Sequence, residues 1–403
     1  MRVLNRGMVK TLRTQVGIIG SGPAGLQLAH LLHRAGIDSI VVDNKPRTEI
    51  EDTVKAGILE APAVEVLVET GVTTREAVEA VRHDGIEFHF AGEAHRFDFE
   101  QLVDKAVYLY PQHQVLRDQI AARVSDGNEP LFEHNAQAIV DGDDGLEIRG
   151  TTPDGDDFII HADFVVGADG SSSMAREYVT GSRFSGFFRE YPFAWFGVLV
   201  EAPPSIDELI YSRSEDGFVL ISTRDESVQR MYFQCDHDTD ASQVDDEEIW
   251  QKLQAGVSNR ELIRGPIFRK DVLRFRSYVH DSLRKGHVFL MGDAAHTVPP
   301  TGAKGLNLAM SDVLWLNRAL REYYRSGSEK HLDTYQDDAL TRIWKAAHFS
   351  YWMTSMLHIA PDASEFDKRR QLGELQAVTS SSYAQQYLAD AYTGWAYEAD
   401  DWR

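Results

Sequence analysis

Three short segments of glycine and aspartate, each placed directly after an apolar run, constrain the fold of this chain more than any other feature. The segments and the runs before them are Gly20–Gly25 after Val16–Ile19, Asp169-Gly170 after Phe164–Ala168, and Gly292-Asp293 after Val288–Met291. Short continuous apolar runs are typical of buried parallel strands, and α/β sheets bind their ligands at the C-terminal ends of such strands. The three segments therefore predict one long ligand that lies across the edge of a parallel sheet.

The first segment has the form Gly-x-Gly-x-x-Gly and opens an expected βαβ unit. Residues 23–34 are predicted to form a helix with an apolar face, and residues 40–43 the next strand. Glycines let the backbone turn beside a pyrophosphate, and free N–H groups at the helix start bind its charge. An acid about 20 residues further on can accept hydrogen bonds from a ribose. FAD fits all three segments, and its predicted contacts in this unit are Gly20, Gly22, Ala24, Gly25 and Asp43.

The composition limits the partners and the location. The chain has 403 residues and a formal net charge of −22, which disfavours a nucleic-acid surface and means that an anionic substrate needs a local basic anchor. The single cysteine, Cys235, excludes an internal disulfide and a CxxC redox pair. No apolar stretch approaches the length of a membrane span, and no metal ion is expected. Residues 1–14 lack the apolar core of a signal sequence, so we expect a loose leader and a cytoplasmic location.

The pattern of apolar residues predicts two unlike layers and a helical end. Short alternating segments between Phe187 and Val279 predict a mostly antiparallel sheet inserted between the second and third glycine segments. Residues 306–323, 332–357 and 384–392 predict helices. The predicted fold class is α/β with α+β elements: a Rossmann-like FAD-binding domain, an inserted sheet domain that binds substrate, and a helical C-terminal region. Their expected residues are 14–85, 101–185 and 277–330 for the first, 86–100 and 186–276 for the second, and 331–403 for the third.

A longer stretch around the third glycine segment is more specific. Residues 292–307 read GDAAHTVPPTGAKGLN, and supporting stretches are Glu208–Tyr211, Ser222–Arg224 and Arg342–Ala346. With these stretches, residues 14–397 resemble the single-component FAD-dependent aromatic hydroxylases, and among them the hydroxylases of 4-hydroxybenzoate. The resemblance implies NAD(P)H and O2 as co-substrates, a flavin C4a-hydroperoxide that delivers oxygen ortho to the phenol, and 3,4-dihydroxybenzoate as the product.

The resemblance assigns the anchoring of the substrate carboxylate to Arg224. A planar guanidinium suits this role because it can bind a carboxylate through two parallel hydrogen bonds. Ser222 would lie on the same face of a strand and add a hydroxyl donor, and Tyr232 would add another. In an arbitrary Ser-x-Arg sequence, a surface ion pair would be the plainer interpretation. The implied substrate-binding residues are Tyr211, Ser222, Thr223, Arg224, Tyr232 and Pro300.

A chain of groups that activates the phenol is implied for Tyr211, Tyr392 and His83. Attack on an electrophilic oxygen is faster from a phenolate, and a free phenol has a pKa of about 10, so the site must help to remove the proton. Two tyrosine hydroxyls can pass a proton outwards to a histidine that titrates near neutral pH. The carbonyl of Pro300 would face the phenol. The implied catalytic residues are Tyr211, Tyr392, His83 and Pro300.

The resemblance also implies how the rest of FAD is held. Asp293 would bind the ribityl or pyrophosphate part, and Gln112 the ribityl chain. Lys304 would add positive potential, and residues 306–307 would begin a helix whose positive end faces the edge of the flavin that is negative after reduction. The further cofactor contacts implied in this way are Thr53, Lys55, Gln112, Asp169, Asp293, Lys304, Leu306 and Asn307.

The segment after Asp43 departs from the family's pattern. Where family members carry arginines that assist FAD and NADPH binding, this chain has Asn44, Thr53 and Lys55. Three acids between residues 49 and 52 make the segment negative and would repel a 2′-phosphate within a Debye length. The sequence therefore predicts a preference for NADH or weak discrimination between NADH and NADPH. Candidate contacts to the nicotinamide cofactor, by position only, are Arg176, Arg230 and Arg276.

Two other interpretations stay open on the sequence. One is a hydroxylase of a related aromatic acid such as 4-aminobenzoate or 3,4-dihydroxybenzoate. The other is a non-catalytic flavin redox sensor, which the joint presence of the anchor and the phenol-activating residues disfavours. A homodimer is implied by the resemblance. Apolar residues of the C-terminal helices could form its interface or pack within their own domain, and they are Trp344, Trp352, Met353, Met356 and Leu357.

Overall fold

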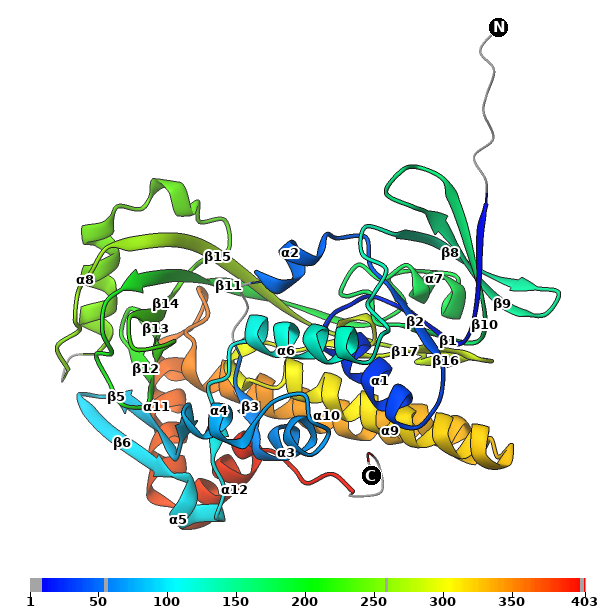
Figure 1. Cartoon of the computed structure of the whole chain (residues 1–403). Coiled ribbons are helices and arrows are strands. Elements are labelled where there is room, and N and C mark those ends of the chain that lie inside the picture. The colour runs from blue at the N-terminus through cyan, green and yellow to red at the C-terminus, as the bar shows by residue number, and fades with distance from the viewer. Residues whose placement is uncertain (1–8, 54–56, 258–259, 399–401, 403) are drawn as a thin grey trace, which may run out of the picture.

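The computed structural model describes residues 9–53, 57–257, 260–398 and 402. These residues form a seven-stranded sheet, an eight-stranded sheet and a small three-stranded sheet, with helices packed around them (Figure 1). Two long strands, β11 (Gly186–Glu201) and β15 (Ile267–His280), run from the side of the first sheet to that of the second. The cofactor and substrate parts of the chain are thus joined by continuous paired strands.

The first sheet carries all three glycine segments along one edge. Its strands are β1 (Lys10–Ile19), β2 (Ser39–Val42), β8 (Asn135–Gly142), β9 (Gly145–Thr151), β10 (Asp157–Gly167), β16 (Arg284–Lys285) and β17 (Val288–Leu290). The strands β2, β1, β10 and β17 are neighbours in that order and are parallel. In the register, Gly167 lies beside Ile19 on one side and Leu290 on the other. Because these residues end their strands, the predicted parallel sheet with its segments on one edge is confirmed.

Helix α1 (Pro23–Arg34) begins within the first segment, at the residue that the sequence predicts. Proline is favourable at this first helical position because the N–H it lacks would have no partner inside the helix. The apolar face of α1 is buried against the sheet and two further helices, α6 (Gln112–Ser125) and α9 (Gly305–Ser326). This packing fixes the start of α1 at the sheet edge, beside the other two segments.

The expectation of a loose leader through residue 14 is wrong for residues 10–14. These residues extend β1 and pair in parallel with residues 158–162 of β10. β10 is 11 residues long and is itself paired with β9, so it offers a stable edge well beyond the apolar run at residues 16–19. Backbone hydrogen bonds form along that edge whatever the polarity of the side chains.

The second sheet is the expected mostly antiparallel layer. Its order is β18-β15-β11-β14-β13-β12-β5-β6, and only the pair β12–β5 within this order is parallel. The strands not yet given are β5 (Gly85–Phe90), β6 (Glu93–Asp98), β12 (Leu209–Ser214), β13 (Gly217–Thr223), β14 (Val228–Asp236) and β18 (His296–Thr297). A helix that the alternating pattern did not predict, α8 (Asp246–Gly256), packs on this sheet, with Asp245 capping its first turn. The strands β15 and β18 reach beyond residue 276, so the sheet includes residues expected in the FAD-binding domain.

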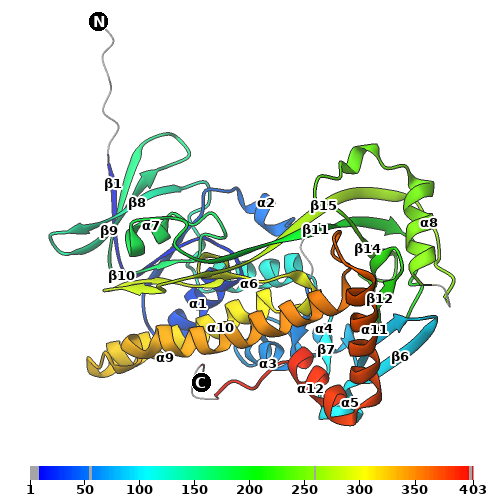
Figure 2. The same ribbon diagram turned by 180° about the vertical axis from the view of Figure 1, so that it is seen from behind.

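The C-terminal region is helical, as expected, and contains α10 (Lys330–Leu357), α11 (Glu365–Ser380) and α12 (Ser382–Thr393) after α9. The long helices α9 and α10 lie together across the back of the molecule (Figure 2). α11 was not predicted, although Ser364 and Asp367 form a capping box at its start. Met353, Met356 and Leu357 are fully buried, so they belong to the core of this chain and the idea that they form an exposed dimer surface is wrong. Trp344 is 45% exposed.

The remaining elements are short. They are α2 (Arg47–Glu51), β3 (Leu59–Glu60), α3 (Ala61–Glu69), α4 (Arg75–Glu79), β4 (Arg82–His83), α5 (Phe99–Val103), β7 (Val107–Tyr108) and α7 (Ala175–Thr180), with the 3₁₀ turns η1 (Ala241–Gln243), η2 (Gly292–Ala294) and η3 (Pro300–Gly302). Within the described part of the chain, no helix combines the length and the apolar character needed to cross a bilayer.

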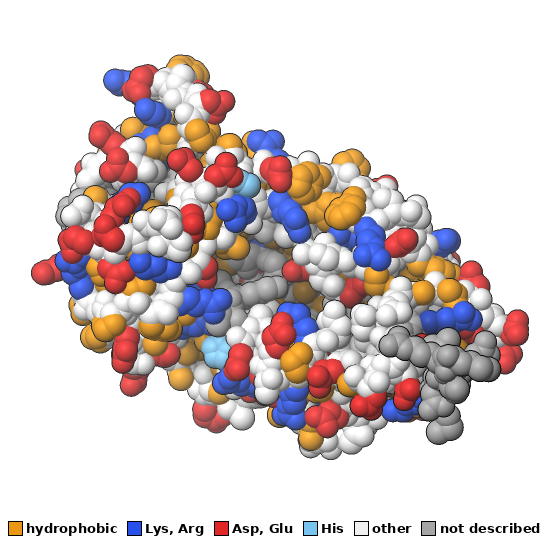
Figure 3. Space-filling model, turned by 90° about the horizontal axis from the view of Figure 1, so that it is seen from above, with side chains coloured by type: hydrophobic (Ala, Val, Ile, Leu, Met, Phe, Trp, Pro, Cys, Tyr) orange, Lys and Arg blue, Asp and Glu red, His pale blue; other side chains and the backbone are white. Residues whose placement is uncertain are grey.

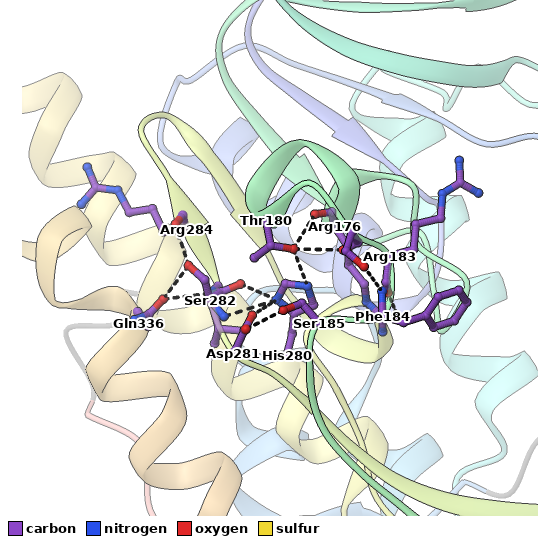
Figure 4. Close-up of polar contacts among 12 residues, drawn as sticks. Arg176, Thr180, Arg183, Phe184, Ser185, His280, Asp281, Ser282, Arg284 and Gln336 are labelled. Carbon is purple, nitrogen blue, oxygen red and sulfur yellow. Dashed lines mark hydrogen bonds and ion pairs between the residues drawn. The ribbon is translucent and has the colours of Figure 1, made fainter.

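Two of the segments that connect the large sheets, one just before β11 and one just after β15, lie side by side and are held together by side chains (Figure 4). The hydroxyl of Tyr278 donates to the carbonyl of Ser185 (2.6 Å), and the Ser185 hydroxyl donates to Asp281 (2.5 Å). His280 is fully buried, with Nδ1 2.7 Å from the Ser282 carbonyl. These contacts join the segment before β11 to the end of β15 and the residues that follow it.

Candidate active site

One continuous cleft of about 1570 Å³ extends from the glycine segments of the first sheet to the face of the second. Figure 3 looks onto the hollow, which has lysine and arginine side chains along its rim. The basic residues that line the cleft are Lys45, Arg183, Arg224, Arg230, Arg274, Arg276 and Lys304. Acids line the cleft as well, and several of the basic residues are paired with carboxylates, as Lys304 is with Glu60 and Arg230 with Asp271. An anionic ligand in this chain of strongly negative net charge therefore requires a basic residue that is not already paired.

The cofactor end of the cleft is shaped by glycines. Gly20 has φ +106°, and a methyl group on it would lie 2.3 Å from the carbonyl of Ala168. A methyl group on Gly25 would lie 2.0 Å from the carbonyl of Gly20, so both positions require glycine for the turn itself. Around Gly22 and Gly170, by contrast, an added methyl group would meet no protein atom within 4 Å. Their open side faces the cleft, where the backbone can approach a ligand.

Two helices begin at this cleft without a side-chain cap. Neither Gly22, which precedes α1, nor Lys304, which precedes α9, makes a capping hydrogen bond. The first N–H groups of a helix need partners, and they carry partial positive charge. Together with the size of the cleft and the open glycines, this arrangement fits the pyrophosphate and the flavin ring of FAD.

The three predicted acids of the cofactor end, Asp43, Asp169 and Asp293, all line the cleft, and Asp43 and Asp169 also bind protein groups. Asp43 lines the cleft, and its carboxylate accepts hydrogen bonds from the backbone N–H and the hydroxyl of Ser21 (2.7 and 2.8 Å). Asp169 accepts from the N–H of Met174 at the start of α7 (2.7 Å), while its buried Oδ1 has no partner among the described residues. Burial raises the pKa of Asp169. Asp293 lines the cleft on η2.

The buried side chain of Arg176 links the second and third glycine segments from the interior of the protein. It is 2% exposed, and it donates to the carbonyls of Ser171 (3.0 Å), Asp293 (2.8 Å) and Ala294 (2.7 Å). The position-based idea that Arg176 contacts a nicotinamide cofactor is therefore wrong, because its side chain is held in the interior and does not line the cleft. Arg276, in contrast, is exposed at the cleft, and Arg230 lines the cleft beside Asp271 (3.2 Å).

Lys304 and Asn307, at the start of α9, are bound to protein groups. Lys304 lines the cleft, yet it is buried, pairs with Glu60 (2.5 Å) and donates to the carbonyl of Tyr392 (3.1 Å). Burial lowers the pKa of Lys304. The Asn307 side chain accepts from the N–H of Glu60 (2.9 Å) and donates to the carbonyl of Ile58 (2.9 Å). Sequence reasoning missed Glu60, whose position at the end of β3, directly before a proline-containing helix, gave no sign of a buried partner.

The other expected cofactor contacts lie at the same end. Gln112 is the first residue of α6 and lines the cleft, as do Thr53, Ala24 and Leu306. The Thr53 hydroxyl also donates to the carbonyl of Glu49 (3.1 Å). Lys55 lies outside the described residues.

The substrate end contains the arginine and hydroxyl groups expected from the sequence. Arg224, Ser222, Thr223 and Tyr232 all line the cleft. Burial lowers the pKa of Arg224, and no carboxylate of the described residues forms an ion pair with it. The Ser222 hydroxyl donates to the carbonyl of Arg230 (2.8 Å), and that of Thr223 to the carbonyl of Ile206 (3.3 Å). Of these residues, Arg224 therefore has the largest unmet capacity to bind an anion.

Two tyrosines meet at the opposite side of the substrate end. The hydroxyl oxygens of Tyr211 and Tyr392 are 2.6 Å apart, and both side chains are buried. Burial raises the pKa of both, so both hydroxyls are neutral at neutral pH. Tyr211 and Pro300 line the cleft.

His83 is not joined to the tyrosines by a hydrogen bond within the described part of the chain. It lies on β4, which pairs with β7, and its buried Nδ1 has no partner there. Burial lowers the pKa of His83. The following residue, Asp84, accepts from the N–H of Phe99 (2.7 Å), and the Phe99 ring stacks on Tyr392 at 5.4 Å. The backbone next to His83 is thus bound to the residue whose ring stacks on Tyr392.

Two residues at the substrate end were missed by sequence reasoning. Trp195 lines the cleft, and its indole N–H donates to Nε2 of His358 (2.6 Å). Burial lowers the pKa of His358 to about 3, so this imidazole is neutral. The other is His113, which contacts Arg224 at 3.3 Å. A single aromatic or histidine within a strand or helix carries no sequence signal for such a role.

Comparisons with known proteins agree with this geometry. A family model described as an FAD binding domain matches residues 13–350. A p-hydroxybenzoate hydroxylase of Acinetobacter baylyi is 39% identical over 394 residues, which cover 97% of each chain. A probable NADH-specific resorcinol 4-hydroxylase of Rhodococcus jostii is 25% identical over 346 residues, which cover 80% of this chain and 61% of the relative.

Among solved structures, the p-nitrophenol 4-monooxygenase PnpA of Pseudomonas putida DLL-E4 superposes with a TM-score of 0.81. The two chains are 18% identical, and the match covers 94% of this chain and 97% of the other. At this identity the likeness shows a shared fold.

Proposed function

The chain belongs to the FAD-dependent aromatic hydroxylases, and from this membership we propose that it converts 4-hydroxybenzoate to 3,4-dihydroxybenzoate. As a member of this family it is an aromatic monooxygenase that uses FAD, NAD(P)H and O2. The finer assignment concerns the substrate and the residues that hold it.

The observation that carries this proposal is the presence of two different recognition groups in one cleft. Arg224 supplies a partly desolvated guanidinium with no carboxylate partner among the described residues, and Tyr211 supplies a neutral hydroxyl backed by Tyr392. A ligand with a carboxylate at one end and a phenol at the other satisfies both. In 4-hydroxybenzoate these groups lie para to one another on a rigid ring, so binding one end positions the other.

The tyrosine pair would activate the phenol by hydrogen bonding. Because burial raises the pKa of both tyrosines, Tyr211 keeps its proton and donates to the phenolate oxygen. A donated hydrogen bond stabilises the anion and so lowers the pKa of the bound phenol. The proton released would leave through Tyr392 towards His83, whose imidazole is uncharged at neutral pH because burial lowers its pKa, and whose Nδ1 has no partner among the described residues. Pro300 would present its carbonyl to the same oxygen of the neutral phenol.

The other expected residues would hold the cofactor. The glycines at positions 20, 22 and 25 and the start of α1 would bind the pyrophosphate, with Asp43 beside the adenosine ribose. The start of α9, with Leu306, would face the flavin ring, and Gln112 and Asp293 the ribityl chain. When bound, the flavin supplies the activated oxygen that the ring carbon ortho to the phenolate attacks.

A preference for NADH, or weak discrimination, is part of the proposal. Two basic residues near α2 are already paired: Lys45 with Glu49 (2.5 Å) and Arg47 with Glu51 (2.7 Å). A 2′-phosphate would have to compete with these carboxylates, whereas NADH carries no such group.

We also infer a homodimer. Phe187 and Trp344 are exposed and their rings are in contact, with 5.4 Å between the ring centres. Phe184 and Phe188 nearby in the sequence are exposed as well. Exposed contiguous apolar surface is typical of protein interfaces. Light scattering on Trp344→Glu and on the unmodified protein tests this, because a charge at such an interface should produce the monomer.

The proposed function is tested by measuring oxidation of NADH and NADPH by the FAD-loaded protein, with and without 4-hydroxybenzoate, and identifying the product by chromatography. Stimulation with one 3,4-dihydroxybenzoate per nucleotide supports the proposal. Stimulation that yields only peroxide identifies 4-hydroxybenzoate as an effector, and 4-aminobenzoate and 3,4-dihydroxybenzoate are then the next substrates to assay. Absence of stimulation by any aromatic acid would favour the redox sensor.

A further inference from the structure

Arg224, the proposed anchor, is held from the cofactor side of the cleft by a histidine. His113 is the second residue of α6, directly after Gln112, and its Nδ1 lies 3.3 Å from an Nη atom of Arg224. A guanidinium has no acceptor, so Arg224 donates this hydrogen bond and the imidazole accepts it. In this arrangement, Nδ1 of His113 carries no proton.

Charged groups from three elements face His113. Arg224 and Asp225 lie on the turn after β13, Arg117 lies one turn further along α6, and Asp52 follows α2. Burial lowers the pKa of His113, and the Arg224 and Arg117 guanidiniums lower it further. The two carboxylates act in the opposite direction, and Asp52 is itself bound to Arg117 (2.8 Å).

We propose that His113 is a positioning residue for the substrate carboxylate and makes its binding dependent on pH. The proposal rests on the role of Arg224 as the carboxylate anchor. When neutral, the imidazole accepts from one edge of the guanidinium and so holds the opposite edge ready for a carboxylate. When protonated, it can no longer accept from Arg224, and it becomes a second cation beside the bound anion.

The direction of the pH effect follows from the charges. In the substrate-free protein the two guanidiniums oppose protonation of His113, whereas a carboxylate bound at Arg224 favours it. The pKa of His113 is therefore higher in the complex than in the free protein, and binding takes up a proton between the two values. The Kd decreases as the pH falls through that window. Each unit of difference between the two pKa values allows a tenfold change in Kd, and solvent screening reduces that difference. We therefore expect about three- to tenfold tighter binding at pH 5.5 than at pH 8.

The test is a titration of the FAD-loaded protein with 4-hydroxybenzoate, followed by flavin absorption across this pH range. His113→Asn keeps an acceptor near the position of Nδ1 but does not titrate, so it should match the unmodified protein at pH 8 and lose the pH dependence. His113→Leu removes the acceptor and should raise the Kd about threefold or more at pH 8. His348→Asn changes an exposed histidine on α10 and should keep the original pH profile.

Two results would overturn the role of His113: an unchanged pH dependence in His113→Asn, or unchanged affinity at pH 8 in His113→Leu. Arg224→Ala separates this proposal from the proposed function. If Arg224→Ala binds weakly while the His113 variants bind normally, only the role of His113 is wrong. If Arg224→Ala binds normally, or if the unmodified protein binds neither 4-hydroxybenzoate nor 4-aminobenzoate, the anchor is wrong and the role of His113 is wrong with it.

Discussion

The two ends of the cleft recognise their ligands with different parts of the chain. At the cofactor end, the available groups are mostly backbone: open glycines and the uncapped starts of α1 and α9. Side chains there, such as Asp43 and Asn307, are already bonded to the protein. At the substrate end, Arg224 and Tyr211 present side-chain groups to the cleft. A long cofactor can be held by the shape of the backbone, whereas a small aromatic acid is selected by a few charged and hydroxyl groups. Loss of a side-chain group should therefore impair the substrate end, and atoms added beside the backbone should impair the cofactor end.

The largest effect is expected at the boundary between the ends, where Glu60 and Lys304 form a buried pair. Glu60→Gln leaves a buried ammonium without its carboxylate and should lower the free energy of unfolding by about 3–5 kcal/mol. Chemical denaturation measures this. Glu65→Gln is the matched control, because Glu65 pairs with Arg75 at the surface, and its loss should cost less than about 1 kcal/mol. Equal effects of the two variants would contradict the buried pairing.

Arg224→Ala tests the substrate end alone. Removing a charged partner of the carboxylate should weaken 4-hydroxybenzoate binding by about 3 kcal/mol, or roughly 100-fold, with FAD content unchanged. Spectral titration gives both quantities. Arg149→Ala, which removes an arginine of a surface pair on β9, should leave the affinity as it is. A loss of FAD in Arg224→Ala would mean that the two ends are not separable.

Tyr211→Phe should separate binding from chemistry within the substrate end. Without the Tyr211 hydroxyl, the bound phenol loses its donor, and hydroxylation should fall by about 10² while nucleotide oxidation continues and yields peroxide. The ratio of aromatic product to nucleotide consumed measures this. An unchanged ratio of aromatic product to nucleotide in Tyr211→Phe would contradict the role of Tyr211 in deprotonating the phenol.

The smallest effect is expected for Gly22→Ala at the cofactor end. An added methyl group meets no protein atom, so the fold should be unaffected, but the group enters space assigned to the pyrophosphate and should weaken FAD binding about tenfold, or about 1.4 kcal/mol. Gly373→Ala, on α11 with equally free space, is the control and should keep the FAD affinity. FAD affinity equal to the original in Gly22→Ala would place the cofactor elsewhere.

The cofactor end was the more predictable from the sequence. Turn glycines and apolar runs have a fixed local form, and helix α1 and the placement of the three segments along one edge of the sheet followed from them. The extension of β1 through residues 10–14 was not predictable, because it depends on the partner β10 rather than on its own polar residues. Likewise, Met353 and Met356 give the same helical pattern whether they face a dimer partner or, as here, the core.

At the substrate end, the resemblance implied that Tyr211 and Tyr392 act together, but the sequence did not predict which protein group binds Arg224. The meeting of Tyr211 and Tyr392 joins positions far apart in the chain, and only the fold brings their hydroxyls to 2.6 Å. The same holds for Glu60 with Lys304 and for His113 with Arg224. Local periodicity carries no information about such long-range pairs. Glu60 and His113, which bind Lys304 and Arg224, were therefore missed.

The most direct test of this account is a comparison of three ligands by spectral titration of the FAD-loaded protein: 4-hydroxybenzoate, benzoate and phenol. If Arg224 binds the carboxylate and Tyr211 the phenol, 4-hydroxybenzoate should bind most tightly, benzoate more weakly, and phenol least of all because it lacks the charged contact. Phenol binding as tightly as 4-hydroxybenzoate would contradict the assignment of the substrate end.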